Sequence, residues 1–205
     1  MKTVVYRVLS QVLGVILLAV GVFALVAGLY AHSYVSSQLS QEKITMPAAA
    51  AYKTLPQASQ DALAPYAGQP MTTGDQAQAF ANHYIWEHMS AACTTIKDAN
   101  GNSVPAVPAE KCNYSGLGGV VSATTDPAQK AAYTALRNTL FQGDTLRTSL
   151  LTAYAFWLIG TIAVWIGIAA LVIGVILLAL SLTVFKSKSL AHANPVAEAE
   201  AVLAN

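Results

Sequence analysis

The chain has 205 residues, of which 55% are hydrophobic and 10% are charged, with a formal net charge of +1. Because soluble domains carry about 25% charged residues, this composition excludes a disordered chain, a nucleic-acid-binding protein and an ordinary soluble enzyme as first interpretations. The apolar residues gather in two blocks. The expected fold class is therefore an all-α membrane protein, with two long antiparallel transmembrane helices and a small, mostly helical, disulfide-containing extracytoplasmic domain.

The first predicted transmembrane helix covers residues 8–34, after a short N-terminal segment of residues 1–7. From Val8 to Ala31 there are 24 residues without a charge or a histidine, and about 20 apolar residues are enough to cross a bilayer. Lys2 and Arg7 precede this block, as basic residues precede the apolar core of a signal peptide. The block is long for such a core and ends in a poor cleavage site, so we expect an uncleaved anchor.

Residues 35–147 are predicted to form the extracytoplasmic domain. A short helix is expected over residues 57–64, where Pro56 can serve as its first residue and Pro65 stops it. Farther along, residues 97–112 contain an Asn-Gly pair and two prolines, which favour a turn with an irregular loop or a short hairpin.

A longer helix is predicted between these two segments, ending near Cys93. Thr72 and Thr73 are N-cap residues, and Asp75 and Gln76, three positions later, complete capping boxes. Apolar residues at helical spacing should form the face that packs inward, and they are Ala77, Phe80, Ala81, Tyr84, Ile85, His88 or Met89, and Ala92.

Cys93 and Cys112 both lie in this domain, and the chain has no other cysteine. An isolated pair in an exported segment most often forms a structural disulfide, which would contribute about 3 kcal/mol to stability. A redox-active pair would need C-x-x-C spacing, and a metal site would need further thiols. The pair therefore predicts a structural disulfide in an oxidising compartment.

A second helix start lies at Asp126-Pro127, an N-cap followed by proline at the first helical position. Gly143 is expected to end this helix, and Asp144 to cap the next one, which runs into the membrane. The second transmembrane helix is predicted over residues 148–185, all 38 of which lack a charge or a histidine. At 1.5 Å per residue it would be about 57 Å long, so we expect one helix that begins outside the hydrocarbon.

Flanking charges set the expected orientation. Lys2 and Arg7 precede the first transmembrane helix, and Lys186 and Lys188 follow the second, whereas residues 35–147 carry seven basic and eight acidic residues. Long loops cross a membrane largely regardless of their charge, so the short flanks decide the orientation. We expect a cell-membrane protein with both termini cytoplasmic, including a tail of residues 186–205, and with the central domain extracytoplasmic.

Glycines repeat every seven residues in both apolar blocks. Seven residues are nearly two helical turns, so each series lies on one face, and small residues let helices approach closely in lipid. Although glycine is common in membrane helices generally, the two matched series predict a packing seam, either within the chain or with a partner helix. Leu25 and Leu171 are expected to lie off this face. The predicted glycine seam consists of Gly14, Gly21, Gly28, Gly160, Gly167 and Gly174.

Few residues are candidates for chemistry. His83 and Glu87 are four residues apart and could share a metal ion, but His88 lies about 140° round the helix from His83, and the spacing misses both zincin patterns. We expect His83 and Glu87 on the solvated side of the helix, His88 as a core histidine, and neither a metal site nor a cofactor.

Other motifs give weaker signals. The serines lack a G-x-S-x-G context, and the glycines at 116, 118 and 119 lack the lysine of a phosphate-binding loop. Residues 113–115 match a glycosylation sequon. His32 and His192 have no partner pattern.

The entry into the second transmembrane helix, Leu140–Trp157 followed by Ile159–Ala163, resembles that of a family of uncharacterised actinobacterial two-span membrane proteins. The layout of span, loop with a Tyr-Ala-Gly-Gln segment (residues 66–69) and span is similar as well. Members are sometimes named ring-opening dioxygenase, but no iron-ligand set is visible here. The resemblance implies an actinobacterial source and no defined activity.

These observations favour a non-catalytic membrane subunit or scaffold of a larger respiratory or cell-envelope complex, because no catalytic constellation is visible and a packing seam is available. An extracytoplasmic sensor or ligand-binding protein that acts through a partner is the alternative, and an enzyme that uses His83 and Glu87 is the third hypothesis. The expected partners are the lipid bilayer and other membrane protein subunits, without nucleic acid.

Overall fold

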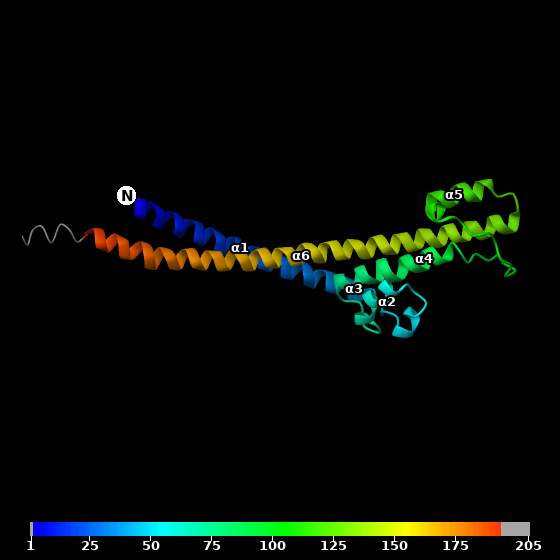
Figure 1. The fold of residues 1–205 in the computed structure, drawn as a ribbon, viewed down its shortest axis with the longest axis horizontal. Coiled ribbons are helices and arrows are strands. Elements are labelled where there is room, and N and C mark those ends of the chain that lie inside the picture. The colour runs from blue at the N-terminus through cyan, green and yellow to red at the C-terminus, as the bar shows by residue number, and fades with distance from the viewer. Residues whose placement is uncertain (1, 194–205) are drawn as a thin grey trace, which may run out of the picture. The chain divides into compact units, whose positions relative to one another are not determined.

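The computed structural model, which describes residues 2–193, is all-helical, with 78% helix and no strand among those residues. Two long helices, α1 (Lys2–Gln41) and α6 (Pro127–Ala193), come before and after a series of short ones along the chain (Figure 1). The last part of the predicted tail, residues 194–205, lies outside the described residues. The short helices are η1 (Ala49–Tyr52), α2 (Gln57–Leu63), η2 (Ala64–Tyr66), α3 (Gly74–Ala79), the π-helical η3 (Phe80–Ile85), α4 (Trp86–Ala92), η4 (Ala109–Lys111) and α5 (Tyr114–Ala123).

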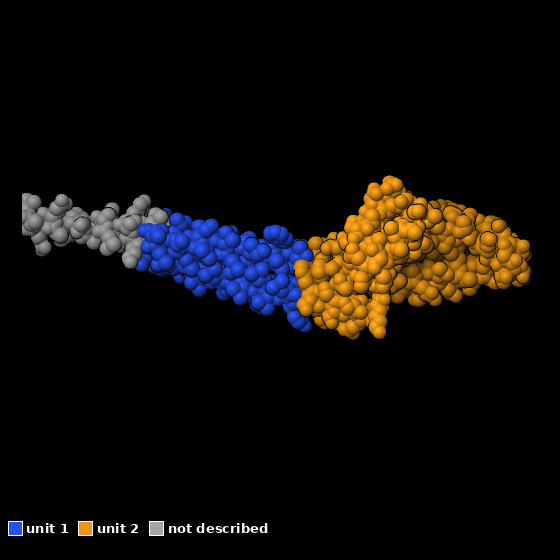
Figure 2. Space-filling model, turned by 90° about the horizontal axis from the view of Figure 1, so that it is seen from below, with its two compact units in different colours: residues 1–31, 159–205 blue, residues 32–158 orange. Residues whose placement is uncertain are grey.

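The chain divides into two compact units, residues 1–31 with 159–205 and residues 32–158 (Figure 2). In the first unit, large apolar side chains lie open on the helix surfaces, with Phe23 76% and Trp165 67% exposed. By length and composition, α1 and α6 each contain a stretch long and apolar enough to cross a membrane, Val5–Gln41 and Pro127–Thr183.

The core of the second unit, residues 32–158, takes buried side chains from most of its helices. Leu39 of α1, Leu63 of α2, Leu117 of α5 and Leu140 of α6 all belong to this core. The loops contribute too, since Met46 and Met71 are buried in it. Helices that are short in themselves are therefore held by packing, because isolated helices of this length are marginal in water.

The predicted start of the long central helix is confirmed. The Thr73 hydroxyl accepts a hydrogen bond from the Gln76 amide N–H (3.3 Å), and the Gln76 side chain accepts one from the Thr73 amide N–H (3.0 Å), which completes a capping box at the start of α3. The second predicted box does not form, because the Thr72 amide N–H donates to Gln76 rather than to Asp75 (2.7 Å). The predicted short helix over 57–64 is confirmed as α2, with Pro56 at its N-cap.

A π-helical segment joins α3 to α4. The buried residues Ala77, Ala81, Ile85, Met89 and Cys93 follow one another at intervals of four. In a pure α-helix, residues four apart differ by about 40° in direction around the helix axis. Over the four intervals, Cys93 would therefore point about 160° away from Ala77 around that axis. The wider turn of η3 offsets that rotation, so all five side chains reach the core.

The expected break at Gly143 is wrong, because α6 continues through it as one helix of 67 residues, and Asp144 is not a cap. A single glycine costs a helix about 1 kcal/mol, which tertiary packing can outweigh. A Cβ at Gly143 would lie 2.6 Å from Met89 Sδ. The glycine therefore serves the close approach of α4 to α6 rather than a helix end. The predicted start at Asp126-Pro127 is confirmed, since Asp126 Oδ1 accepts from the Gln129 amide N–H (2.8 Å).

Helix α5 has no counterpart among the predicted elements. Its three glycines disfavour a helix, but Asn113 caps its start by accepting from the Gly116 amide N–H (2.8 Å). A Cβ at Gly116 would lie 2.6 Å from the carbonyl oxygen of Lys111, so a glycine is needed at that close contact.

Residues 97–112 contain the expected turn, closed by an isolated antiparallel bridge between Lys97 and Ser103, followed by an irregular loop and η4. Gly101 lies at the tip of the turn with a φ of 83°, a conformation that favours glycine. The carboxylate of Asp98 accepts from the amide N–H groups of Asn100 (2.9 Å) and Asn102 (2.8 Å) and from the Asn102 side chain. The hydrogen bond from the Asn102 side chain is the main cause of the lowered pKa of Asp98.

Candidate functional site

The six glycines predicted as a seam lie in three contacting pairs within the first unit. A Cβ built on Gly14 would lie 3.1 Å from the carbonyl oxygen of Gly174, and one on Gly21 would lie 3.0 Å from that of Gly167. At Gly28 the distance to the carbonyl oxygen of Gly160 would be 2.6 Å. A Cβ on Gly14, Gly21 or Gly28 would therefore be overpacked, most severely at Gly28.

Large apolar side chains fill the space beside the glycines. Leu171 packs on Gly21, where a Cβ would meet its Cγ at 2.8 Å, and Leu25 packs on Gly167 at the same distance. The expectation that Leu25 and Leu171 lie off the glycine face is therefore wrong. The reason is that a helical side chain leans toward the preceding turn, so each leucine covers the surface beside a glycine four residues earlier in its own helix.

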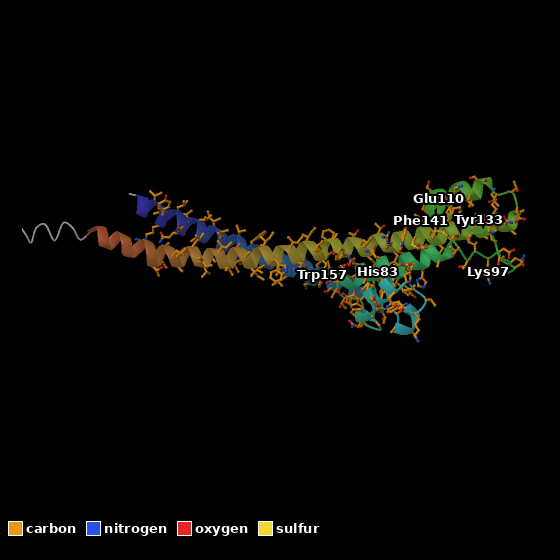
Figure 3. All side chains as sticks on the ribbon, in the orientation of Figure 1. His83, Lys97, Glu110, Tyr133, Phe141 and Trp157 are labelled. Carbon is orange, nitrogen blue, oxygen red and sulfur yellow. A yellow bond between two sulfur atoms is a disulfide. The ribbon has the colours of Figure 1, made fainter. Side chains whose placement is uncertain are left out.

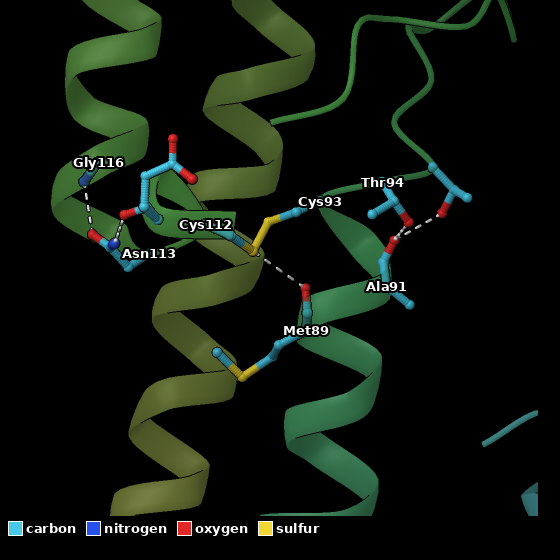
Figure 4. Close-up of a disulfide and its surroundings, with 9 residues drawn as sticks. Met89, Ala91, Cys93, Thr94, Cys112, Asn113 and Gly116 are labelled. Atoms are coloured by element: carbon cyan, nitrogen blue, oxygen red, sulfur yellow. Dashed lines mark hydrogen bonds between the residues drawn. A yellow bond between two sulfur atoms is a disulfide. The ribbon is translucent and has the colours of Figure 1, made fainter. Parts of the chain in front are cut away.

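The disulfide between Cys93 and Cys112 is present and joins the end of α4 to the residue that follows η4 (Figure 4). The two Cα atoms are 6.0 Å apart, and Cys93 is almost fully buried. The bond closes the segment between Cys93 and Cys112 and holds both of its ends at the core, because Cys93 belongs to the core and Cys112 packs against it.

His83 and Glu87 converge on a buried serine of α2. Ser59, which is 2% exposed, donates to Glu87 Oε1 (2.9 Å), and its Oγ lies 3.3 Å from His83 Nδ1. A serine hydroxyl carries one proton, so His83 must donate through Nδ1–H to Ser59 Oγ. The expected position of His83 and Glu87 on the solvated side is thus wrong, because Ser59, which lies 24 and 28 residues earlier in the sequence, holds both in a half-buried cluster. His83 is labelled in Figure 3.

The geometry of this cluster differs from that of a catalytic triad. A nucleophilic serine keeps its hydroxyl proton for a histidine base and faces the substrate, whereas Ser59 is buried and donates to a carboxylate. The arrangement instead ties α2 to the central helix and fixes the orientation of the Glu87 carboxylate. Among the described residues, no three His, Cys, Asp or Glu side chains lie close enough to hold a metal ion.

His88 is exposed, so its predicted place in the core is wrong. Its Nδ1 lies 2.8 Å from the carbonyl oxygen of Tyr84, and the two rings are 4.2 Å apart. The Tyr84 ring stacks in turn on Phe80 at 5.0 Å. The π-helical segment produces this row of rings by keeping side chains four residues apart on one face.

His32 packs on a tryptophan of α6 although no sequence pattern pointed to a partner. Its ring stacks on Trp157 at 4.1 Å, and its Nε2 lies 3.1 Å from the Trp157 carbonyl oxygen. The indole N–H of Trp157 donates to Asp75 (3.2 Å). The side chain of His192 lies outside the described ones.

Three exposed aromatic side chains lie in two clusters with half-buried arginines, Trp86 with Arg147 and Tyr114 and Phe141 with Arg137. We call these five residues the aromatic surface. The Arg137 guanidinium lies 3.9 Å from the centre of the Tyr114 ring, and that of Arg147 lies 4.9 Å from the centre of the Trp86 ring. Phe141 follows Arg137 and precedes Arg147 in the sequence of α6. Its side chain is 56% exposed, and the centre of its ring lies 5.5 Å from that of Tyr114. Sequence reasoning missed this set because its members come from three separate helices.

Comparison of the chain with protein-family models, with curated proteins and with solved structures finds no match.

Proposed function

We propose that the chain is a two-span membrane protein whose apolar helices form an antiparallel hairpin. The glycine pairs support this arrangement, since the partner of Gly14 is Gly174, that of Gly21 is Gly167 and that of Gly28 is Gly160. Each step of seven residues forward in the first helix corresponds to a step of seven residues backward in the second. Close backbone approach through small residues is the usual way in which helices associate in lipid.

The exposed apolar surface of these helices also supports a membrane position. Phe23 and Trp165 are mostly exposed, as are Val26 and Ile159. A soluble protein rarely exposes so many large apolar side chains on two helices. Lipid would cover it without a penalty.

The proposed orientation places both termini in the cytoplasm and residues 35–147 outside. Basic residues flank the two apolar stretches at the chain ends, with Lys2 and Arg7 before the first and Lys186 and Lys188 after the second. The disulfide in the central part agrees with this placement, because disulfides persist in oxidising compartments.

We further propose that the protein is a non-catalytic subunit or scaffold of a larger membrane complex, such as a respiratory or cell-envelope assembly. The aromatic surface is the observation that carries this proposal. Tryptophan, tyrosine and arginine are the residue types that dominate binding energy at protein interfaces. Here rings and guanidinium groups of these types stack on one another while Trp86 stays 46% exposed.

The test is co-purification of the tagged full chain from its native membrane, followed by native mass spectrometry. A stoichiometric protein partner should remain with the wild type and be lost from Trp86→Ala and Phe141→Ala. The control is Leu146→Ala, which removes an exposed apolar side chain from a different face of α6. A chain that is recovered without any protein partner would contradict the subunit proposal.

The alternative, a ligand-binding sensor that acts through a partner, is favoured by one observation. Glu87 lines a pocket of 570 Å³. A retained small molecule in the same mass spectra would support this alternative.

A further inference from the structure

The pocket beside Glu87 lies in the second unit, between the segment that leads into α2 and the outer side of α4. Thr54, Leu55 and Pro56 form one wall, and Glu87, Ser90 and Ala91 contribute to the other. Its volume of 570 Å³ falls within the range of small-molecule sites, about 300–1,000 Å³.

The Glu87 carboxylate is oriented before any ligand arrives. Its Oε1 accepts a hydrogen bond from the buried Ser59 hydroxyl (2.9 Å), which in turn interacts with His83. Residues placed by such supporting hydrogen bonds lose little freedom on binding, so the cost of ordering the site is small. Within the described part of the chain, Ser59 is the donor to this carboxylate, and its Oε2 receives no hydrogen bond from the protein.

The titratable side chains that line the pocket are those of Glu87 and His88, and His88 Nδ1 lies 2.8 Å from the carbonyl oxygen of Tyr84. Neither lysine nor arginine lines the pocket, and Lys53, which precedes Thr54 in the chain, is exposed outside it. A half-buried carboxylate without an ion pair favours a positively charged ligand, since the attraction is stronger where water is partly excluded. Leu55, Pro56 and Ala91 supply apolar surface beside that charge.

We propose that this pocket binds an organic cation, an ammonium or guanidinium group on a short apolar stem, with Glu87 as the counter-ion and the Leu55, Pro56 and Ala91 side chains against the stem. The cation can belong to a free small molecule or to a lysine or arginine side chain of a partner. The proposal rests on the pocket alone and is independent of the subunit function.

The test compares two probes that differ only in charge, using the full chain in a nonionic detergent. N-acetylargininamide carries a guanidinium group, and N-acetylcitrullinamide carries a neutral urea of the same shape. Titration followed by ligand-observed NMR should show saturable binding of the first probe and at least about tenfold weaker binding of the second, as expected for the loss of a hydrogen bond between charged groups.

Glu87→Gln isolates the charge, because glutamine keeps the oxygen that accepts from Ser59. It should weaken binding of N-acetylargininamide about tenfold, whereas Glu110→Gln, which removes an exposed carboxylate outside the pocket, should leave binding unchanged. Equal binding of both probes, or an unchanged affinity in Glu87→Gln, or no saturable binding of N-acetylargininamide, would overturn the proposal.

The source of the cation is decided on protein from the native membrane. A small amine or guanidine released on denaturation and detected by mass spectrometry identifies a free ligand. A carbodiimide crosslink from Glu87 to a lysine of another protein identifies a partner side chain. Both results support the pocket as a cation site. Recovery of an anion or a neutral ligand from this pocket would contradict it.

Discussion

Alanine substitutions along the glycine seam should destabilise the helix pair in a graded order. At Gly28 the new Cβ would meet backbone, the Gly160 carbonyl oxygen at 2.6 Å and the Val164 nitrogen at 2.9 Å. At Gly14 the nearest atom is Cγ of the Leu178 side chain, at 2.9 Å, and the closest backbone atom, the Gly174 carbonyl oxygen, is farther away at 3.1 Å. A side chain can change its rotamer to make room, whereas backbone can only move if the two helices separate.

Two opposing effects set the magnitude. Alanine is favoured over glycine within a helix by about 1 kcal/mol, and overpacking a tight contact costs about 1–3 kcal/mol. At Gly14, where Leu178 can yield, the two effects nearly cancel. At Gly28, where the new Cβ meets backbone, the overpacking cost lies in the upper part of its range, about 2–3 kcal/mol, so we expect a net loss of about 1–2 kcal/mol.

Thermal unfolding of the purified chain in detergent, followed by circular dichroism, measures the order. Gly28→Ala should have the lowest Tm, and Gly14→Ala should be close to the wild type. Ala19→Leu and Ala169→Leu are matched controls, because both add side-chain volume at exposed positions in the same unit. A Gly28→Ala variant that is as stable as the wild type would refute the packing argument.

Three further results are expected in the second unit. Cys93→Ser with Cys112→Ser should lower the free energy of unfolding by about 3 kcal/mol, because the lost crosslink closes a loop of 19 residues, and an unchanged denaturant midpoint would exclude that role. Ser59→Ala should cost about 1–3 kcal/mol, since it leaves the half-buried Glu87 without its donor, and Ser122→Ala on the exposed side of α5 should cost little. The lowered pKa of Asp98 means that its contribution to folding is complete above the ordinary pKa and is lost as the pH falls through the lowered one, and Asn102→Ala should raise that pKa in an NMR titration.

Local signals in the sequence predicted the elements that depend on nearby residues. The Thr73–Gln76 capping box and the Asp126-Pro127 start are formed by residues within one helical turn, so a short window contains all of the information. The pairing of Cys93 with Cys112 follows from there being two cysteines in the chain.

Tertiary contacts decided the elements that the sequence did not predict. Gly143 was predicted to end a helix because its contact residue, Met89, lies far from it in the sequence. His83 and Glu87 looked solvated because their common partner, Ser59, lies on another helix. The π-helical segment did leave a signal in the sequence, since apolar residues recur at intervals of four from Ala77 to Cys93, which is longer than the α-helical period of 3.6.

Cysteine accessibility in intact cells tests the central claim, a two-span protein with its central domain outside, most directly. Both native cysteines are in the disulfide, so a new one can be labelled selectively with a membrane-impermeant maleimide. Ser122→Cys, at an exposed position of α5, should be labelled in intact cells, and Ser187→Cys, in the segment predicted to be cytoplasmic, only after the membrane is opened. Labelling of Ser187→Cys in intact cells, or protection of Ser122→Cys until lysis, would contradict the proposed topology.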